Sequence, residues 1–101
     1  MVKYGFYVRM EAKPEKAEEV AQFLRDAQAL VEAEPRTITW FANRVGPTSF
    51  FIYDTFHDEE GRDIHFHGKV RDGLLARAEE LFAEPPTITP VDILAAKLHL
   101  D

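Results

Sequence analysis

The sequence predicts an α+β protein with the ferredoxin-like order strand, helix, strand, strand, helix, strand (β-α-β-β-α-β). This order gives a four-stranded antiparallel sheet with its helices on one face. Three observations predict it. Apolar residues recur at every second position near the start of the chain, and they recur at helical spacing after Pro14. Two later segments rich in β-branched and aromatic residues are joined by Gly46 and Pro47. A length of 101 residues allows one domain, over residues 1–101.

The first part of the chain predicts one strand and one helix. Residues 2–13 alternate between apolar and polar positions, which is typical of a strand. Pro14 suits the first position of a helix, and the glutamates just after it suit the positive end of the helix dipole. We expect this helix to end at Pro35.

The remainder predicts a hairpin, a helix in two pieces and a final strand. Residues 38–45 and Ser49–Phe56 are rich in β-branched and aromatic side chains. Asp58 is a suitable N-cap for a short helix that ends near Gly68, and a second helical segment follows until two consecutive prolines. Residues 87–98 predict a long last strand, in which a proline requires a sheet edge or a bulge.

The composition excludes several classes of function. The formal net charge is −6 and the 12 Lys and Arg are scattered, so no basic stripe is present for a nucleic acid or an anionic membrane surface. Cysteine is absent, which excludes disulfides and thiolate chemistry and fits a reducing compartment. Residues 1–10 lack the features of a signal peptide, and no apolar run has the length of a membrane helix. We therefore expect a soluble cytoplasmic protein.

Both faces of the predicted sheet carry apolar residues, although the helices can cover only one of them. In the second strand Trp40 lies on one side and Phe41 on the other, and the third and fourth strands alternate similarly. An uncovered apolar face of this size is unusual in a monomer, and a second copy of the chain packed sheet against sheet would cover it. We therefore expect a homodimer; the alternative is that long side chains such as Arg44 and Lys97 fold over the face.

The histidines give little indication of a metal site. His65 and His67 are two positions apart in a predicted helix, so they point to different sides rather than to one ion. His57 and His99 are expected to be surface residues. The five glycines form neither a dinucleotide-binding nor a phosphate-binding motif.

Two aspartates interrupt otherwise apolar strands. Asp54 lies in the third strand and Asp92 in the fourth. A charged residue at such a position needs a partner, and we expect pairing with Arg44, Arg9 or a backbone donor in preference to catalysis.

Short segments distributed over the whole chain resemble a known family. They are VRMEAKP at 8–14, EPRTITWF at 34–41, YDTF at 53–56, DEEGR at 58–62 and ILAAKL at 93–98, with His65 on the helix after the third strand. In their order and spacing the chain resembles the antibiotic biosynthesis monooxygenase (ABM) family. This family is a branch of the dimeric α+β barrel proteins that includes small quinol monooxygenases.

The resemblance implies oxidation of an electron-rich phenol, quinol or anthrone by dioxygen, without flavin, haem or metal. His65 matches the histidine that the family usually carries on this helix, and its ordinary pKa of about 6.5 suits a general base. Trp40 and Tyr53 would supply a stacking wall and a hydrogen-bond donor, and Asn43 or Arg44 would orient an oxygen substituent. Each also has a structural interpretation, as a core, interface or helix-packing residue.

The chain departs from its relatives in two respects. Many of them carry a second histidine five residues after the first, where this chain has Val70. The haem-degrading branch has Asn on the first strand and Trp on the third, whereas this chain lacks that Asn and has its tryptophan on the second. Haem degradation is therefore the less favoured enzymatic interpretation. The alternative to an enzyme is a non-catalytic dimeric barrel that binds a hydrophobic metabolite.

Overall fold

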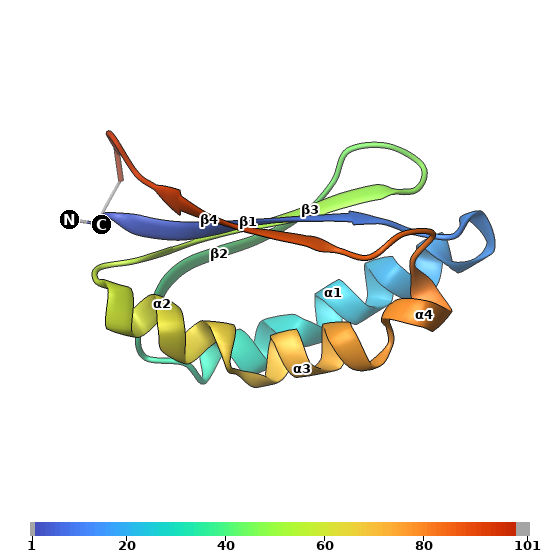
Figure 1. The fold of residues 1–101 in the computed structure, drawn as a ribbon, viewed down its shortest axis with the longest axis horizontal. Helices are drawn as coiled ribbons and strands as arrows, with labels where there is room; N and C mark the ends of the chain where they lie inside the picture. Colours follow the sequence, from blue (N-terminus) through green and yellow to red (C-terminus); the bar gives the residue numbers. More distant parts are fainter. Residues whose placement is uncertain (1, 99–101) are drawn as a thin grey trace.

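The computed structural model describes residues 2–98 and confirms the ferredoxin-like order. One antiparallel sheet, in the order β2-β3-β1-β4, contains the strands β1 (Tyr4–Glu11), β2 (Thr37–Arg44), β3 (Ser49–Phe56) and β4 (Thr87–Asp92). A 3-10 turn, Pro14–Lys16, leads into α1 (Ala17–Glu32). The other helices are α2 (Glu59–Phe66), α3 (Lys69–Ala76) and α4 (Ala78–Leu81). All the helices lie beneath one face of the sheet (Figure 1).

The main core lies between this face and the helices. Every second residue of β1 points into it, as the alternating pattern predicts, and so do Phe50, Ile52 and Phe56 of β3. The apolar stripe of α1 packs against them, with Val20 and Leu24 buried at its centre. The helices are therefore held on the sheet by their apolar sides.

The start of α2 is fixed by Asp58, which confirms the predicted N-cap. Its carboxylate accepts a hydrogen bond from the Gly61 backbone N–H at 2.8 Å and from the Arg36 guanidinium at 2.7 and 2.9 Å. The Gly61 bond, more than Arg36, holds the pKa of Asp58 below its usual value. Since Arg36 directly precedes β2, these bonds fix α2 beside that strand.

The two largest differences from the predicted boundaries lie in the second half of the chain. The second helical segment is divided at Arg77 into α3 and α4. The turn there brings Leu81 beside the chain just after β1, where Lys13 N–H donates a hydrogen bond to Leu81 C=O at 2.9 Å. The last strand ends at Asp92 rather than at 98. Asp92 pairs with Tyr4, the first residue of β1, so no partner strand extends further. The apolar residues that follow lie outside the sheet, and Leu94 is 93% exposed.

The other face of the sheet has no helix over it. Its side chains include aromatic residues from three strands, with Phe41 56% and Tyr7 39% exposed. β4 adds Thr87, Thr89 and Val91, so this edge is more polar than predicted. Within residues 2–98, no helix has both the length and the apolar character needed to span a bilayer.

Candidate functional site

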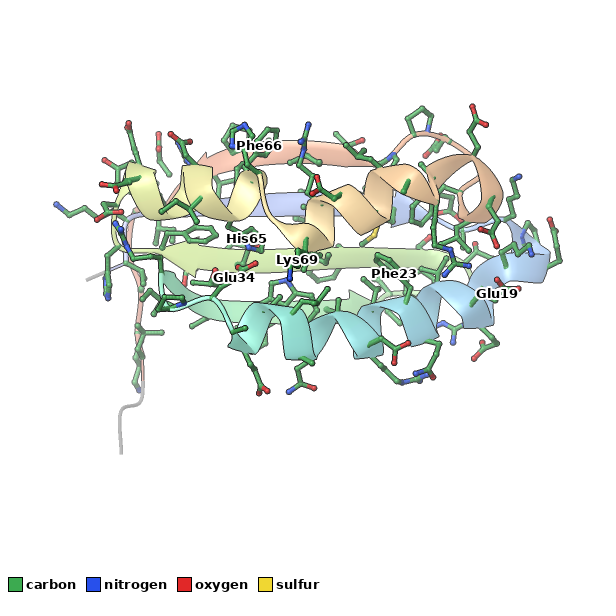
Figure 2. All side chains as sticks on the ribbon, turned by 90° about the horizontal axis from the view of Figure 1, so that it is seen from below. Glu19, Phe23, Glu34, His65, Phe66 and Lys69 are labelled. Carbon is green, nitrogen blue, oxygen red and sulfur yellow. The ribbon has the colours of Figure 1, made fainter. Side chains whose placement is uncertain are left out.

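A histidine and two acidic residues form a polar cluster between the sheet and the helices. His65, in the last turn of α2, contacts Glu34 Oε1 through Nδ1 at 2.5 Å and Asp54 Oδ2 through Nε2 at 3.0 Å. Glu34 comes from the loop between α1 and β2, and Asp54 from the middle of β3. Figure 2, viewed from the helix side, shows His65 and Glu34 meeting between α1 and α2. Both imidazole nitrogens are thus occupied by carboxylates.

The cluster is buried, and burial and the neighbouring carboxylates act on the pKa of His65 in opposite directions. Asp54 is fully buried, and the side chains of His65 and Glu34 are 10% and 19% exposed. Burial by itself lowers the pKa of His65, but the interactions with Asp54 and then Glu34 outweigh it, so the pKa lies above the usual 6.5. The C-terminal end of α2 also favours a cation there. Both carboxylates thus stabilise the protonated imidazole, whereas the prediction of a general base rested on the ordinary pKa.

Local contacts hold Glu34 in place. Thr37 Oγ1–H donates a hydrogen bond to Glu34 Oε1 at 2.7 Å, and Glu34 N–H donates to Val31 C=O at 2.9 Å. A Cβ at Gly68 would lie 3.2 Å from Glu34 Oε2 and 3.0 Å from the carbonyl oxygen of His65. Glycine at this position therefore leaves room for the glutamate.

Asp54 has a backbone partner but not the predicted arginines. Its Oδ1 accepts a hydrogen bond from Phe6 N–H at 3.2 Å, which confirms the expectation of a backbone donor, whereas neither Arg44 nor Arg9 pairs with it. Oδ2 is buried and lacks a well-directed hydrogen bond, because the close contact with His65 is poorly aligned. Asp92 is exposed at the end of β4.

The cluster borders a small apolar cavity beneath α2 and α3. The cavity has a volume of about 30 Å³, and its polar lining residues are Asp54, His65 and Arg71. Phe6 and Phe66 are among its apolar walls, and the Arg71 guanidinium stacks over the Phe66 ring at 4.4 Å. This space accommodates a molecule of about the size of water but not an aromatic ring.

The carboxylates do not converge as metal ligands do. Glu34 and Asp54 contact opposite nitrogens of the same imidazole, so the ring separates them. Among residues 2–98, no group of three or more His, Asp or Glu side chains is arranged to hold a metal ion. His57 and His67 are exposed, and His99 lies outside the described residues.

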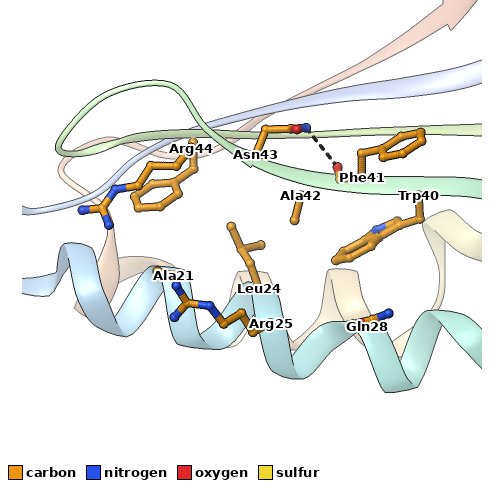
Figure 3. A pocket seen from close by; sticks show the side chains of 10 residues that line it. Ala21, Leu24, Arg25, Gln28, Trp40, Phe41, Ala42, Asn43 and Arg44 are labelled. Atoms are coloured by element: carbon orange, nitrogen blue, oxygen red, sulfur yellow. Dashed lines mark hydrogen bonds between the residues drawn. The ribbon is translucent and has the colours of Figure 1, made fainter.

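A larger pocket lies between α1 and the edge strand β2. It has a volume of about 360 Å³, and Trp40, Asn43 and Arg44 are among its lining residues. Figure 3 shows Trp40 and Arg44 directed toward α1 while Asn43 points away, its amide bonded to the Phe41 carbonyl at 3.4 Å. Arg44 also contacts Glu18 at 2.9 Å at this end of the strand. Three of the predicted substrate-binding residues therefore meet at one pocket, with Trp40 and Arg44 as its inner walls.

Tyr53 is not part of this pocket. The hairpin register pairs Trp40 with Asp54 and Phe41 with Tyr53, so Trp40 faces the helices and Tyr53 faces the uncovered side of the sheet. The two rings cannot form one wall within a chain. Trp40 instead packs against Ala27, Val31 and Val70, which makes it a partly buried core residue as well as a pocket residue.

Sequence reasoning missed Glu34 and the pairing of Asp54 with His65. Glu34 follows a helix in an ordinary loop, where an acidic residue gives no local signal. Asp54 did give a signal, as a charge inside an apolar strand, but its partner lies in another element.

Comparisons with known proteins identify relatives by structure. No protein-family profile and no curated protein matches the chain. NE2512, a protein of unknown function from Nitrosomonas europaea, is 42% identical, with a TM-score of 0.95 over 100% of this chain and 98% of its own. Rv0793 from Mycobacterium tuberculosis is 14% identical, with a TM-score of 0.82 over 93% and 97%. A protein named antibiotic biosynthesis monooxygenase is 17% identical, with a TM-score of 0.78 over 91% and 99%.

These likenesses differ in what they establish. At 42% identity over its full length, NE2512 is a family relative, but its function is unknown. The more distant structures share the fold. The chain therefore belongs to the family of the Nitrosomonas europaea NE2512 protein and shares its α+β fold with a solved protein named antibiotic biosynthesis monooxygenase.

Proposed function

We propose that the protein is a cofactor-independent monooxygenase that oxidises a small electron-rich aromatic of the phenol, quinol or anthrone type with dioxygen. The observation that carries this proposal is the buried Glu34, His65 and Asp54 cluster, which places acid–base groups in apolar surroundings next to the Trp40 pocket. The fold shared with a protein named antibiotic biosynthesis monooxygenase supports the same chemistry.

The reaction needs no reductant besides the substrate. A phenol and dioxygen give a p-quinone and water: one oxygen atom forms the new carbonyl, and the other leaves as water with two hydrogens of the substrate. The substrate supplies all four electrons that dioxygen accepts. What the protein must do is remove the phenolic proton and exclude bulk water, since a phenolate is a far better electron donor than a phenol.

The two hollows suit different parts of this task. The 360 Å³ pocket lies within the range that accommodates small ligands, and the Trp40 ring offers a stacking surface. The 30 Å³ cavity is large enough for a molecule the size of dioxygen or water. His65, whose pKa is raised by Asp54 and Glu34, lies in the wall of this dry cavity.

Oxygen uptake tests the proposal. With 1,4-dihydroxynaphthalene and anthrone, we expect consumption above a protein-free blank and a large reduction in His65→Ala. His67→Ala is the matched control, because His67 is exposed and lies only two residues further along the chain. No consumption with either substrate would contradict an oxygenase.

A second candidate function is binding of an aromatic metabolite without catalysis. It is favoured by the size of the cavity at His65, which at about 30 Å³ does not admit a ring in the described conformation. Saturable binding of 1,4-dihydroxynaphthalene under argon, together with no oxygen uptake in air, would support this candidate over the enzyme.

We also propose that the protein forms a homodimer through the uncovered face of the sheet. Phe41, Tyr7, Phe51 and Tyr53 lie on this face, and the Tyr7 and Phe51 rings are 5.8 Å apart. An exposed aromatic cluster on a helix-free sheet face is a favourable surface for a second copy of the chain.

A further inference from the structure

Two complementary polar atoms without hydrogen-bond partners lie on residues that face each other across β2 and β3. Among the residues described, the buried side-chain atoms without a partner are Trp40 Nε1, Asp54 Oδ2 and Arg71 Nε. Trp40 and Asp54 are direct partners in the strand register, and both point to the helix-covered side. Opposite residues of an antiparallel pair have Cβ atoms about 4.5–5.5 Å apart, so one small group can reach both side chains.

The two atoms require opposite partners. The indole N–H can only donate a hydrogen bond, and an ionised carboxylate can only accept one. They do not bond to each other in the structure. Folded proteins leave few buried polar atoms without a hydrogen bond. A ligand or a solvent molecule placed between Trp40 Nε1 and Asp54 Oδ2 would supply the missing hydrogen bonds. A hydroxyl group offers both an oxygen lone pair for Trp40 and a proton for Asp54.

The surroundings favour an aromatic hydroxyl. Trp40 lines the 360 Å³ pocket with Leu24 and Phe50, whereas Asp54 lines the small cavity with Phe6. The pair therefore lies between an apolar space of ligand size and a dry cavity. An apolar ring in the pocket, with its hydroxyl directed past Trp40, would satisfy both atoms.

The geometry also distinguishes Asp54 from His65 as the hydrogen-bond acceptor. Both ring nitrogens of His65 lie within 3.0 Å of carboxylate oxygens, so the imidazole has no nitrogen available for a substrate. Apart from its 3.0 Å contact with His65, the buried Asp54 Oδ2 has no hydrogen-bond partner, and a carboxylate oxygen can accept a further hydrogen bond. His65 and Glu34 then act through Asp54, as positioning residues that compensate its charge in the interior.

We propose that Trp40 Nε1 and Asp54 Oδ2 together bind one hydroxyl of a small phenol, with the Trp40 N–H donating to the hydroxyl oxygen and the hydroxyl O–H donating to the Asp54 carboxylate. This binding is independent of the proposed function, whereas a role of the bound hydroxyl in oxidation rests on it.

A phenol that dioxygen does not readily oxidise tests the pair apart from turnover. 4-Nitrophenol is suitable, and 4-nitroanisole is its matched methyl ether. Calorimetry should show the phenol binding about tenfold or more tightly than the ether, since the ether lacks the proton.

Two variants separate the roles of the residues. Trp40→Phe removes the donor to the ligand oxygen and should weaken 4-nitrophenol binding about tenfold. Asp54→Asn keeps an acceptor for Phe6 N–H but places an amide NH2 where Oδ2 was, so it should abolish the preference for the phenol over the ether. Asp92→Asn, at an exposed strand position, is the matched control and should behave as the wild type.

Several outcomes would overturn the inference. Equal affinity for the phenol and the ether, no binding up to the solubility limit, or unchanged 4-nitrophenol affinity in Trp40→Phe would contradict the hydroxyl pair. A preference for the phenol that persists in Asp54→Asn and disappears in His65→Gln would assign the hydrogen bond of the hydroxyl to His65. Oxygen uptake that survives both Trp40→Phe and Asp54→Asn would leave the proposed function standing and refute this site.

Discussion

Asp54 on β3 is fully buried, and its Oδ2 lies 3.0 Å from Nε2 of His65 on α2. Its other oxygen accepts the backbone N–H of Phe6 on β1. One carboxylate therefore connects the two central strands of the sheet to the helix layer. Because buried charges depend on their partners, the stability of the fold and the chemistry of the site are coupled through it.

Replacement of Asp54 by alanine should destabilise the protein by about 3–5 kcal/mol, because it leaves the buried His65 and the Phe6 N–H without their partner. The measurement is urea unfolding followed by circular dichroism. Asp92→Ala, at an exposed position of β4, should change the free energy of unfolding by no more than about 0.5 kcal/mol. Similar effects of the two substitutions would contradict a structural role for the Asp54 and His65 pair.

His65 should make stability decrease with rising pH. Its pKa is higher in the folded protein than the usual 6.5, so the stabilisation is complete below about pH 6.5 and is lost as pH rises through the folded value. The carboxylates with lowered pKa values, Glu11, Asp58 and Glu80, act instead at acidic pH, where stability is lost as they become protonated.

Urea unfolding from about pH 5.5 to 9 checks this prediction. In the wild type the free energy of unfolding should fall above about pH 6.5 and level off once the folded pKa is passed. His65→Gln should be less stable and should lack this slope. Parallel curves for the two proteins would show that His65 does not hold its proton more tightly in the folded state.

Gly5 should not tolerate a side chain. A Cβ at this position would lie 2.5 Å from the backbone oxygen of Asp54 and 3.2 Å from Val91 Cγ2, so the central strands would have to separate. We expect Gly5→Ala to destabilise the protein by about 1–3 kcal/mol. Gly46→Ala is the control, because no atom lies within 4 Å of a Cβ there. The measurement is thermal unfolding of both variants. Equal unfolding midpoints for Gly5→Ala and Gly46→Ala would contradict the close packing at Gly5.

A charge on the uncovered sheet face should disrupt the proposed dimer. Phe41 is 56% exposed on this face, so Phe41→Lys should shift the mass in solution from twice 11.6 kDa toward 11.6 kDa. Leu75→Lys places the same charge on α3, where Leu75 is 45% exposed, and should leave the mass unchanged. Size-exclusion chromatography with light scattering gives both masses. A wild-type monomer at micromolar concentration would contradict the dimer.

The order of the strands and helices could be predicted from the sequence, because each pattern that indicates an element lies within that element. Alternation in β1, the stripe on α1 and the Asp58 cap all depend on near neighbours along the chain. The end of the last strand was predicted too late, because the apolar pattern continues to 98 while the partner strand begins at Tyr4. A strand ends where its neighbour ends, and a single strand's pattern does not contain that information.

The site was predicted only in part for the same reason. The family resemblance indicated His65 and Trp40, but the partners of His65 come from a loop and from a distant strand. The faces of Trp40 and Tyr53 depend on the hairpin register, and a shift of one residue would exchange them. Asp54 was recognised as unusual, yet its fixed backbone partner and its unpaired oxygen follow from the packed structure alone.

The hairpin of β2 and β3 also has a consequence for the order of folding events. A short turn between β2 and β3 places Trp40 opposite Asp54, whereas β1 and β4 pair from opposite ends of the described chain. Loop closure is less costly for the nearby pair, and long-range strand pairing slows folding. We expect the two residues to be aligned by an early, local event, so that slow completion of the sheet at β4 leaves their relative placement unaffected.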